Sequence, residues 1–184
     1  MKGKLPERTA ALYFGSLADS DFEEKLAQTY PGARFILLTD ETVAGHWAEF
    51  MVTRFEILHR AEIIELPAGE ESKNLAICQS VWEALSEYEV GRSDVIINLG
   101  GGMITDLGGF VASTFKRGVP FINLPTSLLA QVDAAVGGKT GVDLGPLKNQ
   151  VGLFAEPDFV FLDTGFLQTL PTAQLLSGFA EMLK

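Results

Sequence analysis

Short apolar runs alternate along the chain with longer segments whose apolar residues recur at helical spacing. Apolar runs bounded by polar residues predict five strands, at 33–40, 62–66, 94–99, 119–124 and 159–163. Helical spacing predicts five helices, at 42–54, 72–88, 104–115, 126–135 and 171–184. Continuous apolar strands between helices are typical of a parallel sheet covered on both faces. The chain is therefore predicted to be an α/β protein, in which 136–150 forms a loop with four glycines.

The composition narrows the class of protein. Of the 184 residues, 47% are apolar, which excludes a disordered chain, and the length suits one domain. The net charge of −10 argues against binding nucleic acid or an anionic membrane, since both require an excess of Lys and Arg. No apolar run is long enough to span a membrane, and residues 1–8 lack an apolar signal-peptide core, so we expect a cytoplasmic protein. The single cysteine, Cys78, excludes a disulfide framework. His46 and His59 lack metal-ligand spacing and are expected to be structural or surface residues.

Charged residues and glycines are unevenly distributed. Residues 95–184 carry 5 basic and 7 acidic side chains, and 11 of the 19 glycines lie between Gly91 and Gly145. A buried sheet with tight turns explains part of this pattern. Because burying an unpaired charge is costly, each remaining charge in this half must be solvated, paired or functional. These few charged residues are the first candidates for a functional site.

Three consecutive glycines, Gly100 to Gly102, follow the third predicted strand and open a helix. Glycines let a ligand approach the backbone, and the free N–H groups of the helix N-terminus favour a phosphate or pyrophosphate. The spacing is not G-x-G-x-x-G, so the pattern alone does not indicate a dinucleotide. The alternative is a tight turn without a ligand, in which Asp106 is an ordinary carboxylate of the first helical turn.

Further polar residues follow in the same half of the chain. Thr126 and Ser127 come after the fourth predicted strand, where their hydroxyls suit either helix capping or ligand contacts. Gly137-Gly138-Lys139-Thr140 resembles the end of a P-loop, but that motif requires glycine where the chain has Asp133. The P-loop interpretation therefore fails, although Lys139 in a glycine-rich loop still suits a phosphate. Glu181 and Lys184 share one helix face, where an ordinary surface ion pair is the alternative to a functional role.

Taken in order, these segments resemble the 3-dehydroquinate synthase family. The resemblance runs from about Phe35 to Lys184 and is carried by collinear motifs at Gly100–Ala112, Arg117–Val119, Pro125–Asp133, Val136–Val142, Lys148-Asn149, Thr169–Pro171 and Ser177–Lys184. Upstream, Pro67–Lys73 resembles the nucleotide loop of that family. A long collinear series is more specific than any one of its motifs.

The resemblance implies a Rossmann-like, layered NAD-binding domain with a mostly parallel sheet over 1–170. Residues 171–184 would then be the first helix of a C-terminal helical domain that is missing from this chain. The implied enzyme is a homodimeric lyase that depends on NAD and a divalent metal, zinc or cobalt. It converts 3-deoxy-D-arabino-heptulosonate 7-phosphate, a phosphorylated sugar acid, to 3-dehydroquinate plus phosphate in the shikimate pathway of aromatic amino acid biosynthesis. The reaction combines transient oxidation by NAD, phosphate elimination and aldol cyclisation. Because the family's remaining metal ligands lie in the helical domain, we expect this chain alone to be inactive.

By matching position, the resemblance also implies which residues bind. The implied NAD contacts are Asp40, Glu70, Lys73, Gly101, Gly102, Met103, Asp106, Thr126, Ser127, Leu129, Lys139, Lys148, Thr169 and Leu170. The implied catalytic and substrate-binding residues are Asp133, Lys139, Asn149, Lys184 and Arg117. Arg117 would reach the substrate phosphate across a dimer interface, and Glu181 would be a metal ligand. The basic residues among them suit a substrate that carries both a carboxylate and a phosphate.

Three other functions remain open. Another sugar phosphate cyclase, of the inosose or valiolone type, belongs to the same superfamily. A metal-dependent polyol dehydrogenase is a more distant relative in fold. A non-catalytic NAD-binding or dimerisation module is the candidate from a different class of protein.

Overall fold

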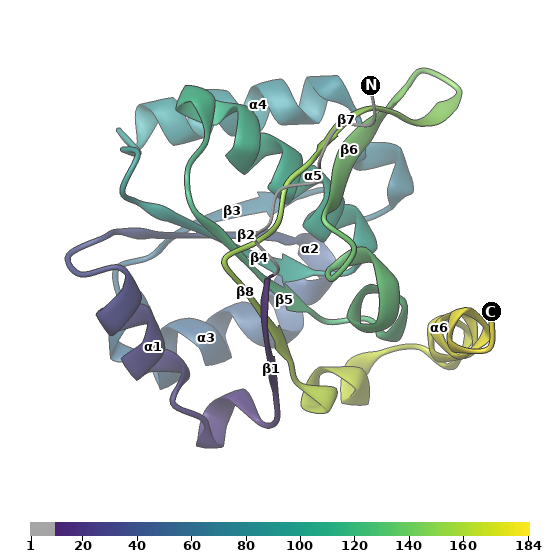
Figure 1. The fold of residues 1–184 in the computed structure, drawn as a ribbon, viewed down its shortest axis with the longest axis horizontal. Coiled ribbons are helices and arrows are strands. Elements are labelled where there is room, and N and C mark those ends of the chain that lie inside the picture. Colours follow the sequence, from purple (N-terminus) through teal and green to yellow (C-terminus); the bar gives the residue numbers. More distant parts are fainter. Residues whose placement is uncertain (1–9) are drawn as a thin grey trace, which may run out of the picture.

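The computed structural model describes residues 10–184, and its centre is a six-stranded sheet (Figure 1). The strands follow the order β1-β8-β5-β4-β2-β3, and every neighbouring pair is parallel. Their bounds are β1 Ala11–Phe14, β2 Phe35–Asp40, β3 Glu62–Leu66, β4 Val95–Gly100, β5 Phe121–Pro125 and β8 Phe159–Leu162. All five predicted strands are present, which confirms the α/β fold with a parallel sheet. Residues 1–8, on which the cytoplasmic expectation partly rested, lie outside the described residues.

Helices cover both faces of the sheet, with α1 and α3 on one face and α4 and α5 on the other (Figure 1). Their bounds are α1 Phe22–Thr29, α2 Glu41–Val43, α3 Glu49–Arg54, α4 Leu75–Glu87, α5 Gly102–Thr114 and α6 Thr172–Met182. Two predicted helices contain π-helical segments, at Ala44–Ala48 and Ala130–Ala134. None of the helices within residues 10–184 combines the length and the apolar character that crossing a membrane requires.

The predicted helix at 72–88 begins three residues later than expected. Residues 70–72 form a 3-10 turn, and α4 starts at Leu75. Asn74 caps the helix, because its side-chain oxygen accepts a hydrogen bond from the Ile77 N–H at 3.0 Å. The loop at 67–73 is therefore separate from the helix and is available to line a site.

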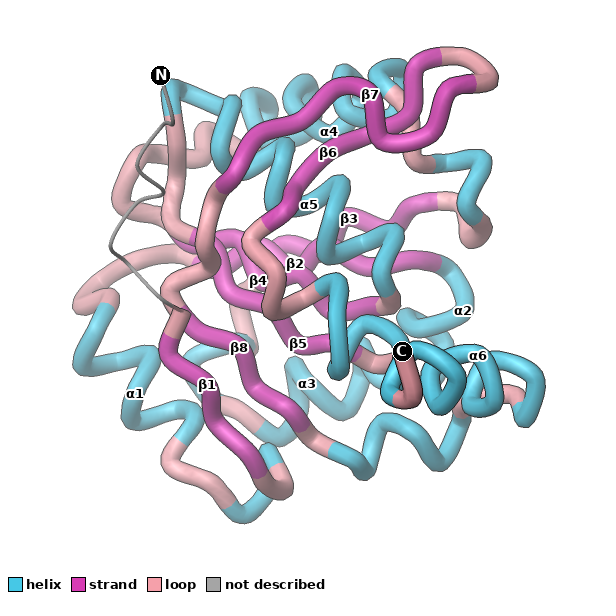
Figure 2. The backbone as a smooth tube through the Cα atoms, turned by 45° about the vertical axis from the view of Figure 1, so that its right-hand side comes forward, coloured by secondary structure: helices cyan, strands magenta, loops and turns pink. Residues whose placement is uncertain are grey.

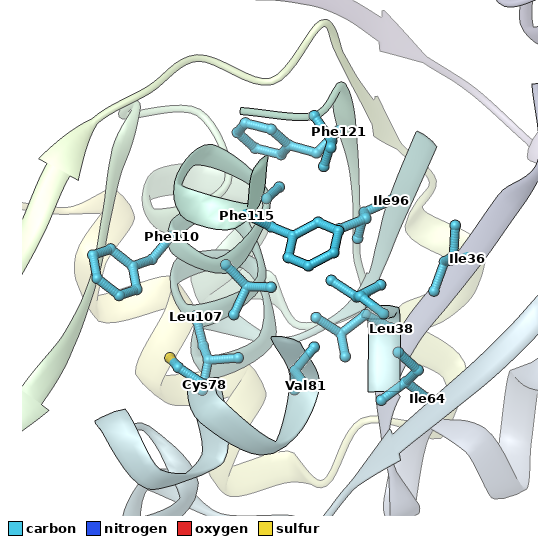
Figure 3. Close-up of a cluster of buried hydrophobic side chains, with 14 of the residues drawn as sticks. Ile36, Leu38, Ile64, Cys78, Val81, Ile96, Leu107, Phe110, Phe115 and Phe121 are labelled. Atoms are coloured by element: carbon cyan, nitrogen blue, oxygen red, sulfur yellow. The ribbon is translucent and has the colours of Figure 1, made fainter. Parts of the chain in front are cut away.

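Two apolar cores lie on the two faces of the sheet. Figure 3 shows the core beneath α4 and α5, whose main side chains are Ile36, Leu38, Ile64, Cys78, Val81, Ile96, Leu107 and Phe110. The other core lies against α1 and α3 and includes Phe22, Phe35, Leu37, Met51, Val95 and Ile97. Successive side chains of a strand point to opposite faces, and here each face is covered by one of the two cores. Every residue of β2 and β4 is therefore buried. This explains the continuous apolar runs in the sequence.

An antiparallel hairpin occupies most of the segment that was predicted to be a loop at 136–150, so that prediction was wrong. Its strands are β6 Lys139–Leu144 and β7 Leu147–Phe154, and they pass alongside α5 (Figure 2). A Cβ atom at Gly109 of α5 would lie 2.5 Å from Cγ2 of Thr140, so only glycine allows this close approach. Gly141 and Gly152 face each other within the hairpin, and such glycines weaken the strand signal in the sequence.

Helix α6 lies at the side of the molecule, next to the π-helical segment at 130–134 (Figures 1 and 2). It approaches closely through Gly178, where an added Cβ atom would lie 2.6 Å from Cβ of Leu128. The rest of its apolar surface is exposed, at Leu176, Phe179, Met182 and Leu183. The helix predicted at 171–184 is confirmed, and the division of the chain into two domains at residue 170 stays a prediction.

Candidate functional site

A cavity of about 500 Å³ opens at the carboxyl ends of β2, β4 and β5. β2 and β4 are neighbours, yet the helices that follow them, α3 and α5, lie on opposite faces of the sheet. Such a switch point leaves a crevice beyond the strand ends, where open α/β sheets bind ligands. The cavity brings together most of the predicted NAD contacts, namely Asp40, Glu70, Lys73, Gly101, Gly102, Met103, Asp106, Thr126, Ser127, Leu129, Thr169 and Leu170. Lys139 and Lys148 are not among its lining residues.

The N-terminus of α5 forms one wall of this cavity. Gly101 is the N-cap residue, and no side chain caps the first N–H groups of the helix. A Cβ atom at Gly101 would lie 3.3 Å from Oγ of Ser127, so a larger residue would crowd the cavity wall. Uncapped N–H groups at the positive end of a helix are the arrangement that binds phosphate groups. The geometry therefore favours an anion site over a turn without a ligand.

Asp40, the last residue of β2, lines the same cavity. Its Oδ1 accepts hydrogen bonds from the N–H groups of Thr42 and Val43, both at 3.0 Å, and these bonds fix the orientation of the carboxylate. A carboxylate beside the switch point is suited to accept hydrogen bonds from ribose hydroxyls. Together with the helix N-terminus, it provides the two kinds of group that a dinucleotide requires, so the described residues fit NAD.

Several lining residues were not predicted from the sequence. His46 and Trp47 reach the cavity from the π-helical segment after β2, and Gln174 and Ser177 reach it from α6. The indole Nε1 of Trp47 donates a hydrogen bond to Oγ1 of Thr169 at 3.1 Å, which ties the 3-10 segment Thr164–Thr169 to the cavity wall. His46 was expected to be a structural or surface residue, and its side chain is exposed, at the cavity. A π-helical turn has no sequence signature in this chain that would have placed these residues.

A buried lysine lies at the inner end of the cavity. Lys73 is only 4% exposed, and its Nζ lies 2.5 Å from Oδ2 of Asp106 and 2.8 Å from Oδ1 of Asn149. Burial raises the pKa of the Asp106 carboxyl above its ordinary value, while the neighbouring Lys73 ammonium acts in the opposite direction. Lys73 therefore joins the loop at 67–73, helix α5 and the hairpin at one point.

A second cavity, of about 460 Å³, adjoins the first beneath the hairpin. Three predicted substrate residues, Asp133, Lys139 and Asn149, line it. Asp106, Asp133 and Ala134 line both cavities, so the two spaces share a boundary. Lys148 lies nearby, with its Nζ 3.3 Å from Oε1 of Glu70, a lining residue of the first cavity. Most of the predicted NAD residues and three of the predicted substrate residues thus form two adjacent groups.

Besides Lys148, three predicted site residues line neither cavity. Arg117 is exposed at the far end of α5, in a left-handed conformation (φ 69°) that follows another at Lys116 (φ 48°). Glu181 and Lys184 form an ion pair at 3.3 Å, which is the arrangement expected of the surface alternative. Within residues 10–184, no three His, Cys, Asp or Glu side chains gather to hold a metal ion. A single carboxylate does not make a zinc site, so the described residues do not fit a metal by themselves.

Comparison with known proteins matches this chain to the N-terminal part of one enzyme family. The family model described as 3-dehydroquinate synthase N-terminal matches residues 63–177, well over half of the chain. The 3-dehydroquinate synthase of Parabacteroides distasonis is 48% identical over 165 residues, which cover 90% of this chain and 46% of that protein. The chain spans about half the length of the curated relatives it matches.

Two solved structures overlap nearly the whole chain. A 2-epi-5-epi-valiolone synthase from Streptomyces hygroscopicus subsp. jinggangensis, with NAD+ and Zn2+ bound, is 28% identical with a TM-score of 0.86. The overlap covers 98% of this chain and 50% of that one. A 2-deoxy-scyllo-inosose synthase, complexed with carbaglucose-6-phosphate, NAD+ and Co2+, is 28% identical with a TM-score of 0.85. That overlap covers 96% of this chain and 48% of the other.

Proposed function

Because the chain belongs to the 3-dehydroquinate synthase family, we propose that it is the NAD-binding part of such a synthase. The complete enzyme would convert 3-deoxy-D-arabino-heptulosonate 7-phosphate to 3-dehydroquinate and phosphate. The observation that carries this proposal is the cavity at the switch point, which is lined by both the uncapped N-terminus of α5 and the carboxylate of Asp40. The solved cyclases of this fold, which contain NAD+ and a divalent metal, support the choice of cofactor.

In this proposal, the residues of the first cavity hold NAD. The N–H groups at the start of α5 bind the pyrophosphate, and Asp40 accepts hydrogen bonds from a ribose. Bound NAD supplies a reversible acceptor for the hydride of a substrate hydroxyl. The shared boundary at Asp106 and Asp133 brings the substrate side of the site next to the cofactor side.

The second cavity holds the substrate in this proposal. Lys139 offers a cation to an anionic group of the substrate, while Asp133 and Asn149 orient hydroxyl groups by hydrogen bonds. Arg117 acts from a second copy of the chain, and its exposed position away from both cavities supports this role. Glu181 contributes one metal ligand, and the other ligands come from outside residues 10–184, since no three His, Cys, Asp or Glu side chains gather within that range.

The first test measures NAD binding by calorimetry. We expect the chain to bind NAD, and Asp40→Asn to weaken binding about tenfold, since a hydrogen bond to a charged group is lost. Asn retains the oxygen that caps α2, so this variant keeps the fold. Glu41→Gln is the matched control, because Glu41 is exposed and does not line the cavity. An absence of binding at millimolar NAD would refute the proposal in favour of a non-NAD module.

The second test measures phosphate release. The chain alone should release no phosphate from the heptulosonate phosphate, because it lacks a metal site within residues 10–184. Release by the chain alone would contradict this part of the proposal.

Another sugar phosphate cyclase is the second candidate, favoured by the extensive overlap with the inosose and valiolone synthases. The higher identity to 3-dehydroquinate synthases favours the first candidate. A panel of sugar phosphates discriminates between them when it is assayed with this chain joined, in turn, to the C-terminal half of the Parabacteroides distasonis relative and to that of the 2-deoxy-scyllo-inosose synthase. Turnover of the heptulosonate phosphate by the first fusion, with no turnover of any sugar phosphate by the second, would support the synthase.

A further inference from the structure

The hairpin carries a β-bulge directly beside two predicted site residues. Val142 pairs with Val151 and Leu144 with Leu147, so three residues of β7 lie opposite the single residue Asp143 of β6. Those three are Lys148, Asn149 and Gln150, and Asn149 has a left-handed backbone (φ 53°). Bulges of this kind redirect side chains and are frequent next to active sites.

Asp143 holds the bulge through both of its carboxylate oxygens. Oδ1 accepts a hydrogen bond from the backbone N–H of Asn149 at 2.7 Å. Oδ2 lies 3.7 Å from Nζ of Lys148. The carboxylate thus takes the place of the backbone partner that regular pairing would have given Asn149.

The backbone of Asp143 is fixed independently of the hairpin. Its N–H donates a hydrogen bond to the carbonyl oxygen of Lys73 at 2.9 Å, and it forms an isolated β-bridge with Asn74. Lys73 in turn donates through its buried Nζ to Oδ1 of Asn149. Asp143 and Lys73 therefore hold Asn149 from two sides, one at its backbone and one at its side chain.

We propose that Asp143 is a positioning residue, which holds Asn149 and Lys148 where they can reach the two ligands. Asp143 lines neither cavity, so it acts through these two neighbours and not by contact with NAD or substrate. Its side chain is 14% exposed and contacts Asn149 and Lys148 of the bulge, while its backbone N–H donates to Lys73 of the loop at 67–73. This inference rests on the proposed function, because it assumes that Lys148 and Asn149 are ligand-binding residues.

The test uses three variants of the chain and two measurements. Asp143→Ala removes both contacts, Asp143→Asn keeps the acceptor for the Asn149 N–H but removes the charge near Lys148, and Leu144→Ala is the control. Leu144 is the next residue on β6, is 49% exposed and lines neither cavity. The measurements are the amide chemical shift of Asn149 by nuclear magnetic resonance and the dissociation constant for NAD by calorimetry.

We expect Asp143→Ala to move the Asn149 amide resonance upfield and to weaken NAD binding about tenfold. Asp143→Asn should retain affinity within about threefold, because the hydrogen bond to Asn149 persists. Leu144→Ala should change neither measurement. If Asp143→Ala does not fold, Asp143→Asn carries the test through its Asn149 resonance, which should move upfield as the acceptor loses its charge.

Two outcomes overturn the inference. One is a folded Asp143→Ala variant with an unchanged Asn149 resonance and unchanged NAD affinity. The other is an equal loss of affinity in Asp143→Ala and Leu144→Ala, which would indicate a general disturbance of the hairpin. If the unmodified chain does not bind NAD, the proposed function fails instead, and the Asn149 resonance still reports on the role of Asp143.

Discussion

Replacement of Lys73 by methionine tests the electrostatic balance at the inner end of the cavity. Lys73→Met keeps the length and apolar stem of the side chain but removes its ammonium group. Asp106 and Asn149 then lose a partner at 2.5 Å and 2.8 Å, and the Asp106 side chain is only 20% exposed. The variant therefore leaves a largely buried carboxylate without its counter-charge.

The expected loss in the free energy of unfolding is about 3 kcal/mol near pH 7.5, since removing one partner of a buried ion pair leaves the other charge uncompensated. Burial already raises the pKa of Asp106, and the loss of Lys73 raises it further. A carboxyl whose pKa is higher in the folded state holds its proton preferentially there. Stability then falls as pH rises from the unfolded pKa through the folded pKa. The deficit relative to the unmodified chain should accordingly shrink as pH is lowered towards about 4.

Urea unfolding at several pH values measures this deficit. Lys148→Met is the matched control, because Lys148 is 64% exposed and its ion pair with Glu70 at 3.3 Å lies on the surface. That variant should lose less than about 1 kcal/mol. Adding Asp106→Asn to Lys73→Met should restore part of the stability, because the uncompensated charge is removed. A loss below 1 kcal/mol in Lys73→Met, or a loss that does not change with pH, would refute this reasoning.

Three further predictions concern packing, thiol reactivity and the cavity wall. Gly109→Ala should lower the free energy of unfolding by about 1–3 kcal/mol, since its Cβ would lie 2.5 Å from Thr140 Cγ2. Gly45→Ala is the control, because a Cβ atom added there would have no other atom within 4 Å, and this variant should raise the free energy of unfolding by about 0.5–1 kcal/mol. Equal effects of the two substitutions in urea unfolding curves would contradict the close packing at Gly109. Burial raises the pKa of the Cys78 thiol to about 12. Alkylation of Cys78 by iodoacetamide at pH 8 should therefore be at least about a hundredfold slower in the folded chain than in denaturant. Equal rates would show that the core around Cys78 is open to the reagent. Trp47→Phe should abolish the quenching of tryptophan fluorescence by NAD, because Trp47 lines the cavity and the other tryptophan, Trp82, lies on α4. Calorimetry should still detect NAD binding by this variant. Undiminished quenching would place NAD elsewhere.

The central sheet was predictable because its strands are buried on both faces. β2 begins with four apolar residues and β4 with three, and no exposed position interrupts either strand. The first strand and helix were not predicted, for the opposite reason. β1 has four residues at the edge of the sheet and exposes Leu12 and Phe14, and α1 fully buries only Phe22 and Leu26. Elements with so few buried positions leave little periodicity to detect.

The strand-end residues and the hairpin residues of the site also differ in how far the sequence predicted them. The residues that follow the strand ends were predictable, because a parallel sheet brings its carboxyl ends to one edge. The hairpin was not, since Gly141 and Gly152 pair within it and its strands pack on α5 and not in the sheet. With the hairpin assigned as a loop, nothing in the sequence indicated a bulge opposite Asp143. The proposed role of Asp143 depends on its tertiary contact with Lys73, which lies 70 residues earlier in the chain.

The pairing of the first strand with the last one has a consequence for biosynthesis. Among the described strands, β1 pairs only with β8, in the register Ala11 to Phe159 and Phe14 to Leu162, so it cannot be paired until the chain has been made as far as Leu162. At ordinary translation rates of about 5–20 residues per second, this leaves β1 unpaired on the ribosome for on the order of ten seconds. During that time its apolar side chains are available to chaperones or to the strand edges of other chains. The rest of the sheet can assemble meanwhile, so the closure of this edge is expected to be the last step in forming the sheet.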